Sequence, residues 1–443
     1  MKWQALDEKA TRRALLTIFL VVFIDLMGFG IVMPNLQLYG HDFGISNYFY
    51  LTLIGATYSF FQFLFAPLLG KWSDRIGRRP VMLVSQAGTL VGFLMLFYAH
   101  FYEHSAVGIS LLFASRILDG VSGGNISTAS AYIADVTKPE NRARGFGMIG
   151  AAFGIGFVFG PLIGGITAKF LGLSYVPLIA AAFSLTALLS TYFYLPESLN
   201  PETKPSDLRR YSLMTLWRVT TRPVIGPLIL IFFVNGFAFA GMEQTLSLLI
   251  QMRLYPTDKT AGMSFQQLAD YVRFQDKSAS FATGLLFFFI GIILAAIQGG
   301  MIHRLTRKFG ERLLVISGPV LIAIGLVIIG IPVDWPWRWT GFGVGCAFLA
   351  VGSSIFNPSL QSLISRHAGS SEQGEVLGAN QGMASLARAA GPVLAGVLFQ
   401  YLSPASPYYV SAAMCVVVSV WAVTLRRQLT PPAVPNSGPS VPV

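Results

Sequence analysis

Charged residues are scarce in this sequence. Lys, Arg, Asp and Glu together make up 12% of its 443 residues, whereas they make up about a quarter of a typical soluble domain. Hydrophobic residues make up 53% of the chain, and the mean hydropathy is +0.61. The composition therefore excludes an ordinary soluble globular protein and indicates a membrane protein with many spanning segments.

Cysteine is also rare. The sequence has only two, Cys346 and Cys415, each inside an apolar stretch, which argues against a disulfide framework or a thiolate metal site. The five histidines show no metal-ligand spacing, and no nucleophile, base and orienting group occur together at a usable spacing. We therefore expect neither enzymatic activity nor a cofactor.

Acidic residues are outnumbered by basic ones, which gives a net charge of +11. In a soluble protein this surplus would suggest a nucleic-acid partner. Here most Lys and Arg fall in the loops on one side of the apolar segments, where the positive-inside rule and anionic lipid account for them. We therefore expect no nucleic-acid partner, and we expect that side, with both chain termini, to be cytoplasmic.

Twelve segments are long and apolar enough to cross a membrane. The first lacks the small-residue cleavage site of a signal peptide, so it should remain as a span. Residues 196–222, which carry several prolines among charges, separate the segments into two sets of six. The expected spans are 14–38, 47–69, 80–100, 107–135, 145–169, 174–195, 223–250, 280–303, 313–332, 340–365, 376–401 and 407–425.

The two sets of six repeat each other, because several glycines and a proline recur at one constant offset of 231 residues. The matching positions are Gly147, Gly160, Pro161 and Gly165 with Gly378, Gly391, Pro392 and Gly396. This repeat predicts an all-α polytopic membrane protein of two pseudo-symmetric six-helix bundles around a midplane cavity. The expected parts are a cytoplasmic tail 1–13, an N-terminal bundle 14–195, a cytoplasmic linker 196–222, a C-terminal bundle 223–425 and a Pro-rich disordered tail 426–443.

A short charged stretch from Gly70 to Pro80 separates the second and third spans. Its Lys and Arg mark the cytoplasmic side, its glycines permit positive φ or close backbone approach, and Asp74 lies among cations that can hold it. The stretch resembles the loop between spans 2 and 3 of the major facilitator superfamily, whose pattern is G-x-x-x-D-R-x-G-R-R. The resemblance implies the major facilitator fold and a transporter.

The resemblance also implies that this loop gates the exchange between conformations. With Asp135 at the end of span 4, its charges could form a network that latches the halves; solvated surface charges, worth under about 1 kcal/mol per pair, are the alternative. Aligned through Gly310, the second copy of the loop is degraded, since Arg307 and Glu311 replace an acid and a base. The expected gate residues are Gly70, Asp74, Arg75, Gly77, Arg78, Arg79, Asp135 and Arg142.

Ionisable residues inside spans are costly and are the first candidates for function. Asp25 lies near the middle of span 1 and Glu243 lies further along span 7. A carboxylate at such a depth is expensive unless it is paired or protonated, so both are expected proton sites. The alternatives are a structural hydrogen-bond anchor for Asp25 and an acceptor for polar neighbours such as Gln244 for Glu243.

Arg116 and Asp119 are three residues apart in span 4 and can neutralise each other on one helical face. The stretch from Arg116 to Gly120 resembles the family's span-4 motif, which implies a role for Arg116 in proton coupling; Asp119 replaces the glutamine common there. Arg388 in span 11 could face the cavity or pair with a carboxylate across the halves. Polar span residues expected at the cavity are Asn125, Asn235, Asn357 and Gln361.

Span 5 is rich in small residues, which allow close helix approach, and it contains a proline that bends the span. The stretch from Gly154 to Gly165 resembles the family's antiporter motif and implies export in exchange for protons, whereas plain tight packing is the alternative. The expected packing residues are Gly156, Gly160, Pro161 and Gly164, with Gly391 and Pro392 in span 11.

The longest outer loop is 251–279. Residues 264–267 resemble a helix capping box, and Phe265, Leu268, Ala269 and Val272 share one helical face. These features predict a short interfacial helix on the outer side. A surface cap without function and a functional element are both open interpretations.

Three stretches, from Gly70 to Leu83, from Tyr132 to Asp135 and from Arg142 to Gly147, look like the tetracycline and multidrug exporters of the twelve-span drug:proton antiporter branch. Those tetracycline exporters have an aspartate within span 9, whereas nothing ionisable lies between Arg312 and Asp334 here. This departure argues against tetracycline itself as a substrate.

The resemblance implies a monomeric antiporter of the bacterial inner membrane. It would export amphipathic drug-like molecules by alternating access, with the proton gradient as the driving force. Its partners would be a small-molecule substrate, protons and membrane lipid. A proton-coupled importer of a sugar or metabolite is one alternative, and a non-transporting membrane receptor is another.

Overall fold

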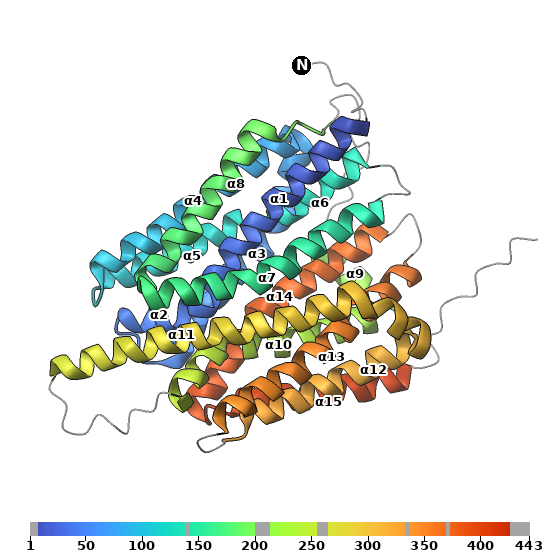
Figure 1. Cartoon of the computed structure of the whole chain (residues 1–443). Coiled ribbons are helices and arrows are strands. Elements are labelled where there is room, and N and C mark those ends of the chain that lie inside the picture. The colour runs from blue at the N-terminus through green and yellow to red at the C-terminus, as the bar shows by residue number, and fades with distance from the viewer. Residues whose placement is uncertain are drawn as a thin grey trace, which may run out of the picture.

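The computed structural model describes residues 8–137, 142–199, 213–254, 265–332, 337–368 and 373–425. These described residues are almost entirely helical and include no strand. Figure 1 shows the helices as two groups that lie side by side, with α1 beginning and α15 ending at the same end of the bundle.

The first half contains α1 (Glu8–Val32), α2 (Leu36–Asp42), α3 (Tyr48–Ile76), α4 (Arg78–Ala99), α5 (Ala106–Ser122), α6 (Asn125–Val136), α7 (Arg142–Phe170) and α8 (Val176–Tyr194). Three short 3-10 helices, η1 (Met33–Asn35), η2 (His100–Tyr102) and η4 (Leu173–Tyr175), join them. After the short α9 (Leu213–Thr220), which lies within the expected linker, the second half contains α10 (Ile225–Leu254), α11 (Phe265–Ala296), α12 (Ile302–Gly330), α13 (Arg338–His367), α14 (Gln373–Tyr401) and α15 (Ser406–Thr424). A π-helix, Ile297–Met301, joins α11 to α12.

Ten helical segments among the described residues are long and apolar enough to cross a membrane. One of them, 275–330, has 56 residues, which is long enough for two crossings of about 20 residues each. A shorter apolar helix covers 154–170. These findings confirm an all-α polytopic membrane protein, and the count of twelve spans stays a prediction.

Two faces of the bundle are distinguished below. The basic face is the end where Gly77, Asp135 and Glu197 lie, and the opposite face is the end where α2 finishes at Asp42 and α10 at Leu254. The halves meet along two seams, α7 against α11 and α3 against α14.

Glycines bring backbones together at matching places in the two halves. A Cβ atom on Gly160 of α7 would lie 2.7 Å from the backbone of Gly30 on α1. In the second half, a Cβ atom on Gly391 of α14 would lie 3.2 Å from the backbone nitrogen of Gly241 on α10. The absence of side chains therefore lets α1 pack on α7 and α10 on α14 at backbone contact.

The charged stretch between the second and third spans is not an extended loop. Helix α3 continues to Ile76 and α4 begins at Arg78, so the expected loop from Gly70 to Pro80 shrinks to Gly77 alone. Gly77 has φ 110° and its counterpart Gly310 has φ 77°, values that favour glycine. Gly70 lies within α3 and does not take the positive φ that it could have adopted, whereas the alignment of Gly77 with Gly310 is reproduced in the backbone.

Two further boundaries differ from expectation. The single span 107–135 is broken into α5 and α6 at Gly123 and Gly124, because a Cβ atom on Gly124 would lie 2.7 Å from Leu69 and 2.9 Å from Ala66. The separate interfacial helix expected at 265–272 is wrong, since Phe265 begins the long α11. The tail 426–443, residues 200–212 of the linker, most of the tail 1–13 and Ser264 lie outside the described residues.

Candidate functional site

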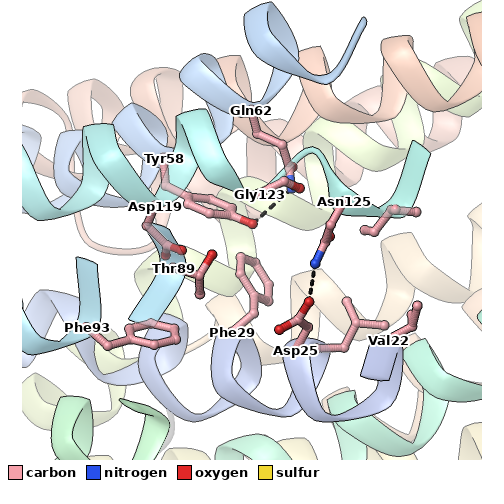
Figure 2. A pocket seen from close by; sticks show the side chains of 12 residues that line it. Val22, Asp25, Phe29, Tyr58, Gln62, Thr89, Phe93, Asp119, Gly123 and Asn125 are labelled. Carbon is pink, nitrogen blue, oxygen red and sulfur yellow. Dashed lines mark hydrogen bonds between the residues drawn. The ribbon is translucent and has the colours of Figure 1, made fainter. Parts of the chain in front are cut away.

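A small cavity lies inside the first half and receives side chains from α1, α3, α4, α5 and α6 (Figure 2). Its volume is about 30 Å³, enough for one or two water-sized groups and far below the several hundred Å³ of a drug-sized site. The lining residues are Val22, Asp25, Leu26, Phe29, Tyr58, Gln62, Thr89, Phe93, Asp119, Gly123, Asn125 and Ile126.

Asp25 and Asn125 meet at one end of the cavity (Figure 2). The amide nitrogen of Asn125 donates a hydrogen bond to Oδ2 of Asp25. Asn125 reaches this position because the break at Gly123 and Gly124 makes it the first residue of α6. Oδ1 of Asp25 is buried without a hydrogen-bond partner, and both side-chain polar atoms of the neighbouring Gln86 are in the same state. One oxygen of the carboxyl group is thus held by Asn125, and the neutral amide of Gln86 lies beside the same carboxyl group.

Asp119 lies at the other end of the cavity, beside Thr89 (Figure 2). Its Oδ2 accepts a hydrogen bond of 3.1 Å from Nη1 of Arg116, and both side chains are buried. The Arg116 guanidinium also lies 5.5 Å from the centre of the Phe93 ring. The structure therefore pairs Arg116 with Asp119, as their spacing predicts, and keeps Arg116 just outside the cavity lining.

Gln62 joins the cavity to the second half. Its Nε2 donates to Oη of Tyr58 and to the carbonyl of Gly123, each at 2.9 Å, and both residues line the cavity (Figure 2). Its Oε1 accepts a long hydrogen bond of 3.5 Å from Nη2 of Arg388. Arg388 thus contacts the first half through a neutral amide, not through a carboxylate of that half.

Glu243 lies apart from the cavity, buried on α10. Its charged neighbour is Arg388 of the same half, and the same Nη2 of Arg388 donates to Ser385 at 3.0 Å. Gln244 accepts a hydrogen bond from Gln37 of the first half, so it is engaged across the halves. The expected pairing of Glu243 with Gln244 is absent among the described residues.

The other polar residues expected at the cavity lie elsewhere. Asn235 is buried on α10 with its Oδ1 4.0 Å from Sγ of Cys415 on α15, which places it inside the second bundle. Asn357 is half-buried and Gln361 is exposed on α13. None of the three lines the cavity of the first half.

Arg78 is the centre of the charge network on the basic face. Its guanidinium donates to Asp74 and Ser73 through Nη1 and, at 3.0 Å, to Asp135 through Nε. The carboxylate of Glu197 accepts the backbone N–H groups of Arg78, at 2.9 Å, and Arg79, at 3.1 Å, and so caps the start of α4. These partners belong to the first half or the residues just after it, so the network joins α3, α4 and α6 within one half.

The remaining expected gate residues take other positions. Arg79 donates to the carbonyl of Tyr192 at 2.6 Å, and Arg75 is exposed. Arg142 begins α7, and its side chain lies outside the described part of the chain. Sequence reasoning missed Glu197, which follows a proline at the start of the expected linker.

The second half carries a charge-reversed counterpart of this network. Glu311, which aligns with Arg78, accepts a hydrogen bond of 2.6 Å from Ser362 and forms an ion pair of 3.2 Å with Arg366. Arg366 lies in the last turn of α13, as Asp135 lies in the last turn of α6. The acid and the base have exchanged places, while the contact between the same two elements persists. The second copy departs from the sequence pattern of the first, yet Glu311 still makes a charged contact between the corresponding elements.

The fold, the paired halves and the charged turn can now be compared with known proteins. The model of the Major Facilitator Superfamily matches residues 18–392 and also 277–442. The chain belongs to this superfamily. Its resemblance to the superfamily, inferred from the Gly70–Pro80 stretch, is thereby confirmed.

Two superfamily members illustrate the range of similar sequences. The bovine major facilitator superfamily domain-containing protein 10 is 29% identical over 409 residues, which cover 86% of this chain and 79% of the relative. The class C tetracycline resistance protein of Escherichia coli is 30% identical over 396 residues, which cover 88% of this chain and 90% of the relative.

A solved structure from the superfamily is similar over nearly the whole fold. It is the human organic anion transporter MFSD10 (TETRAN), with a TM-score of 0.65 and 26% sequence identity, covering 93% of this chain and 99% of the human one. The chain is accordingly a membrane transporter of the major facilitator fold.

Proposed function

We propose that the protein is a proton-coupled antiporter that exports amphipathic drug-like molecules by alternating access. The observation that carries the proposal is the small cavity of the first half, in which one oxygen of Asp25 accepts from Asn125 and the carboxyl group otherwise has the neutral amide of Gln86, not a cation, beside it. A site of about 30 Å³ suits a proton or a water, not a drug. Proton binding and drug binding would then occupy different places.

The charge arrangement around the cavity supports proton exchange at Asp25 more than at Asp119. Asp119 is neutralised by Arg116 at 3.1 Å, so its negative charge is already balanced. Asp25 has an amide donor but no cation among its hydrogen-bond partners in the described residues. Gain of a proton by Asp25 would therefore neutralise a charge that the protein leaves unbalanced.

The drug-export part of the proposal is supported by the class C tetracycline resistance protein, whose name indicates resistance to a drug. The close packing of α7 on α1 through Gly160 and Gly30 fits the antiporter motif that span 5 resembles. We further propose that the protein lies in a bacterial inner membrane with its basic face toward the cytoplasm. In this proposal the transporter acts as a monomer. It has no enzymatic activity and needs no cofactor, because the proton gradient drives transport.

The test is the pH change inside proteoliposomes when a substrate is added. Lipophilic cations, tetracyclines and neutral drugs would be screened with the unmodified protein, Asp25→Asn and Glu243→Gln. We expect a proton signal that Asp25→Asn abolishes and Glu243→Gln retains. A signal lost only in Glu243→Gln would move the proton site to α10, and no signal with any compound in folded protein would overturn drug antiport for the compounds tested.

Arg388 favours a second candidate substrate class, organic anions. Its guanidinium lies where α14 faces α3, and among the described residues its hydrogen bond to the first half is the 3.5 Å contact to Gln62. A carboxylate can bind a guanidinium through two parallel hydrogen bonds, and a similar structure is that of an organic anion transporter. An importer of a metabolite remains a rival, as does a receptor, which would move no compound.

Uptake of an aromatic carboxylate and of its neutral amide would decide between the two substrate classes. For an anion carrier we expect transport of the carboxylate only, with at least a tenfold loss in Arg388→Gln and a smaller loss in Arg388→Lys, which keeps the charge but not the paired donors. Equal transport of acid and amide by the unmodified protein would overturn this candidate.

A further inference from the structure

Asp276 is a buried carboxylate that sequence reasoning left in a loop. The expected span began at 280, but α11 already covers Asp276, whose side chain is only 1% exposed. Its Oδ1 lies 3.7 Å from Nδ1 of His41 and accepts a hydrogen bond from Gln251 on α10. Its Oδ2 is buried without a hydrogen-bond partner.

His41 and Asp276 belong to different halves of the transporter. His41 lies in the last turn of α2, and its side chain is 19% exposed, so it links the buried carboxylate to the medium on the opposite face. Among the described residues, this is an ion pair that joins the halves, whereas the Arg78 and Glu311 networks each lie within one half.

Neutral and aromatic contacts surround this pair and also cross between the halves. The ring of His41 lies 6.3 Å from that of Tyr48, which in turn lies 4.9 Å from Phe399. The backbone N–H of Tyr48 donates to Gln400 at 2.8 Å. In this conformation the opposite face is therefore held closed around a pair of ionisable groups.

The charged groups near the pair come from every element packed around it. Helix α2 also supplies Asp42, whose interactions are already engaged. Arg253 on α10 donates to the carbonyls at the end of α12. Nζ of Lys169 on α7 lies 4.0 Å from the centre of the Phe281 ring. Cε of Lys277 on α11 would lie 3.9 Å from a Cβ atom on Gly172. Arg253, Lys169 and Lys277 form no described ion pair with His41 or Asp276.

We propose that His41 and Asp276 form an ionisable latch between the two halves, and that proton binding to the latch controls the opening of the opposite face. A protonated imidazole and an ionised carboxylate attract each other. Loss of the imidazole proton or protonation of the carboxylate removes one of the two charges, so the attraction weakens at both ends of a pH series. The latch thus holds where both groups are charged and releases the halves when either charge is lost.

The experiment measures how fast the opposite face opens, without any substrate. Thr52→Cys places a reporter on α3 at a fully buried position, where α3 packs against Gly396 of α14. Labelling by a membrane-impermeant maleimide is followed in intact vesicles at a series of pH values on that face. The unmodified protein is the background, because its two cysteines are buried. After quenching, every sample is denatured in the same way and its bound label is measured. The pH dependence of the maleimide reaction itself is measured with a free thiol and divided out.

We expect the corrected labelling rate to pass through a minimum within the pH series, where both groups of the latch are charged. Asp276→Asn should remove the minimum and raise the rate there at least threefold. The double exchange His41→Asp with Asp276→His restores an acid and an imidazole and should restore the minimum, which also shows that the single variant had not simply misfolded.

The matched control is Glu103→Gln. Glu103 and His100 form another acid–imidazole pair on the same face, but within the first half, so this variant should keep the minimum. A pH profile that Asp276→Asn leaves unchanged, or that Glu103→Gln removes equally, would overturn the latch. Because labelling requires no substrate, failure of the latch is separable from failure of the proposed drug antiport.

Discussion

The charged turns of the two halves have the same backbone and opposite chemistry. In the first half, Gly77 precedes Arg78, which binds two carboxylates. In the second, Gly310 precedes Glu311, which binds Arg366. Both glycines have positive φ. The comparison shows that a repeat can preserve the contact between two elements while exchanging which side carries the acid.

The two turns also differ in how deeply their charges are buried. Arg78 and its counterpart Glu311 are equally buried, with side chains 8% and 9% exposed, but their partners are not: Asp74 and Asp135 are 33% and 27% exposed, whereas Arg366 is 55% exposed. Burial strengthens an ion pair and makes the loss of one partner costly, while solvent weakens an exposed pair. The first turn should therefore contribute more to stability than the second.

The largest effect should follow the loss of Arg78. Arg78→Ala leaves Asp74 and Asp135 without their shared cation, and breaking such a pair costs about 3–5 kcal/mol when it is buried; partial exposure of both acids places this variant at the lower end. Thermal unfolding in detergent measures the loss. The control is Arg75→Ala on the same helix, which is exposed and should change little. Equal losses in the two variants would mean that the network does not stabilise the turn.

The next effect compares the two glycines. Alanine in a backbone region that favours glycine costs about 1–3 kcal/mol, so both Gly77→Ala and Gly310→Ala should lower the unfolding midpoint. Gly77→Ala should lower it further, because its Cβ would meet Glu197 and would lie 3.2 Å from Pro80, whereas a Cβ on Gly310 meets nothing within 4 Å. The unfolding midpoints of the two variants are measured under the same conditions. A larger lowering of the midpoint in Gly310→Ala than in Gly77→Ala would contradict this explanation.

The smallest effect should come from the second turn. Glu311→Gln keeps the hydrogen bond from Ser362 and loses the charge attraction to Arg366, which is worth about 1 kcal/mol or less because solvent screens the exposed guanidinium of the pair. The exchange Glu311→Arg with Arg366→Asp copies the polarity of the first turn and should restore the midpoint. A double-mutant cycle measures this coupling, and a coupling as large as that of Arg78 would erase the contrast between the turns.

The sequence predicted those parts of the molecule that depend on strong local signals. The constant offset of the repeat, the φ requirement at Gly77 and the spacing of Arg116 and Asp119 were each visible in a few residues, and the structure reproduces them. Adjacent Gly123 and Gly124 are a local signal for the break in span 4 that the prediction of a single span 107–135 did not take into account.

Other parts depend on tertiary contacts that no local pattern records. Gln62, Tyr58 and Gln86 are neutral polar residues, and such residues are common in helices, so nothing in the chain distinguished them as neighbours of Asp25. Asp276 was missed for a different reason. Its position shortly before an apolar stretch resembles a loop, and only the packing of α11 against α2 and α10 shows that it is buried.

All the residues around the small cavity belong to the first half, which has a mechanical consequence. When the halves rock against each other, the cavity moves as one piece and its own walls need not rearrange. Among the described residues, the hydrogen bond from Arg388 to Gln62 connects this cavity to the second half. In the proposed antiport, a change at Gln62 would therefore separate the proton site from the motion of the second half, and protons would cross without coupled export.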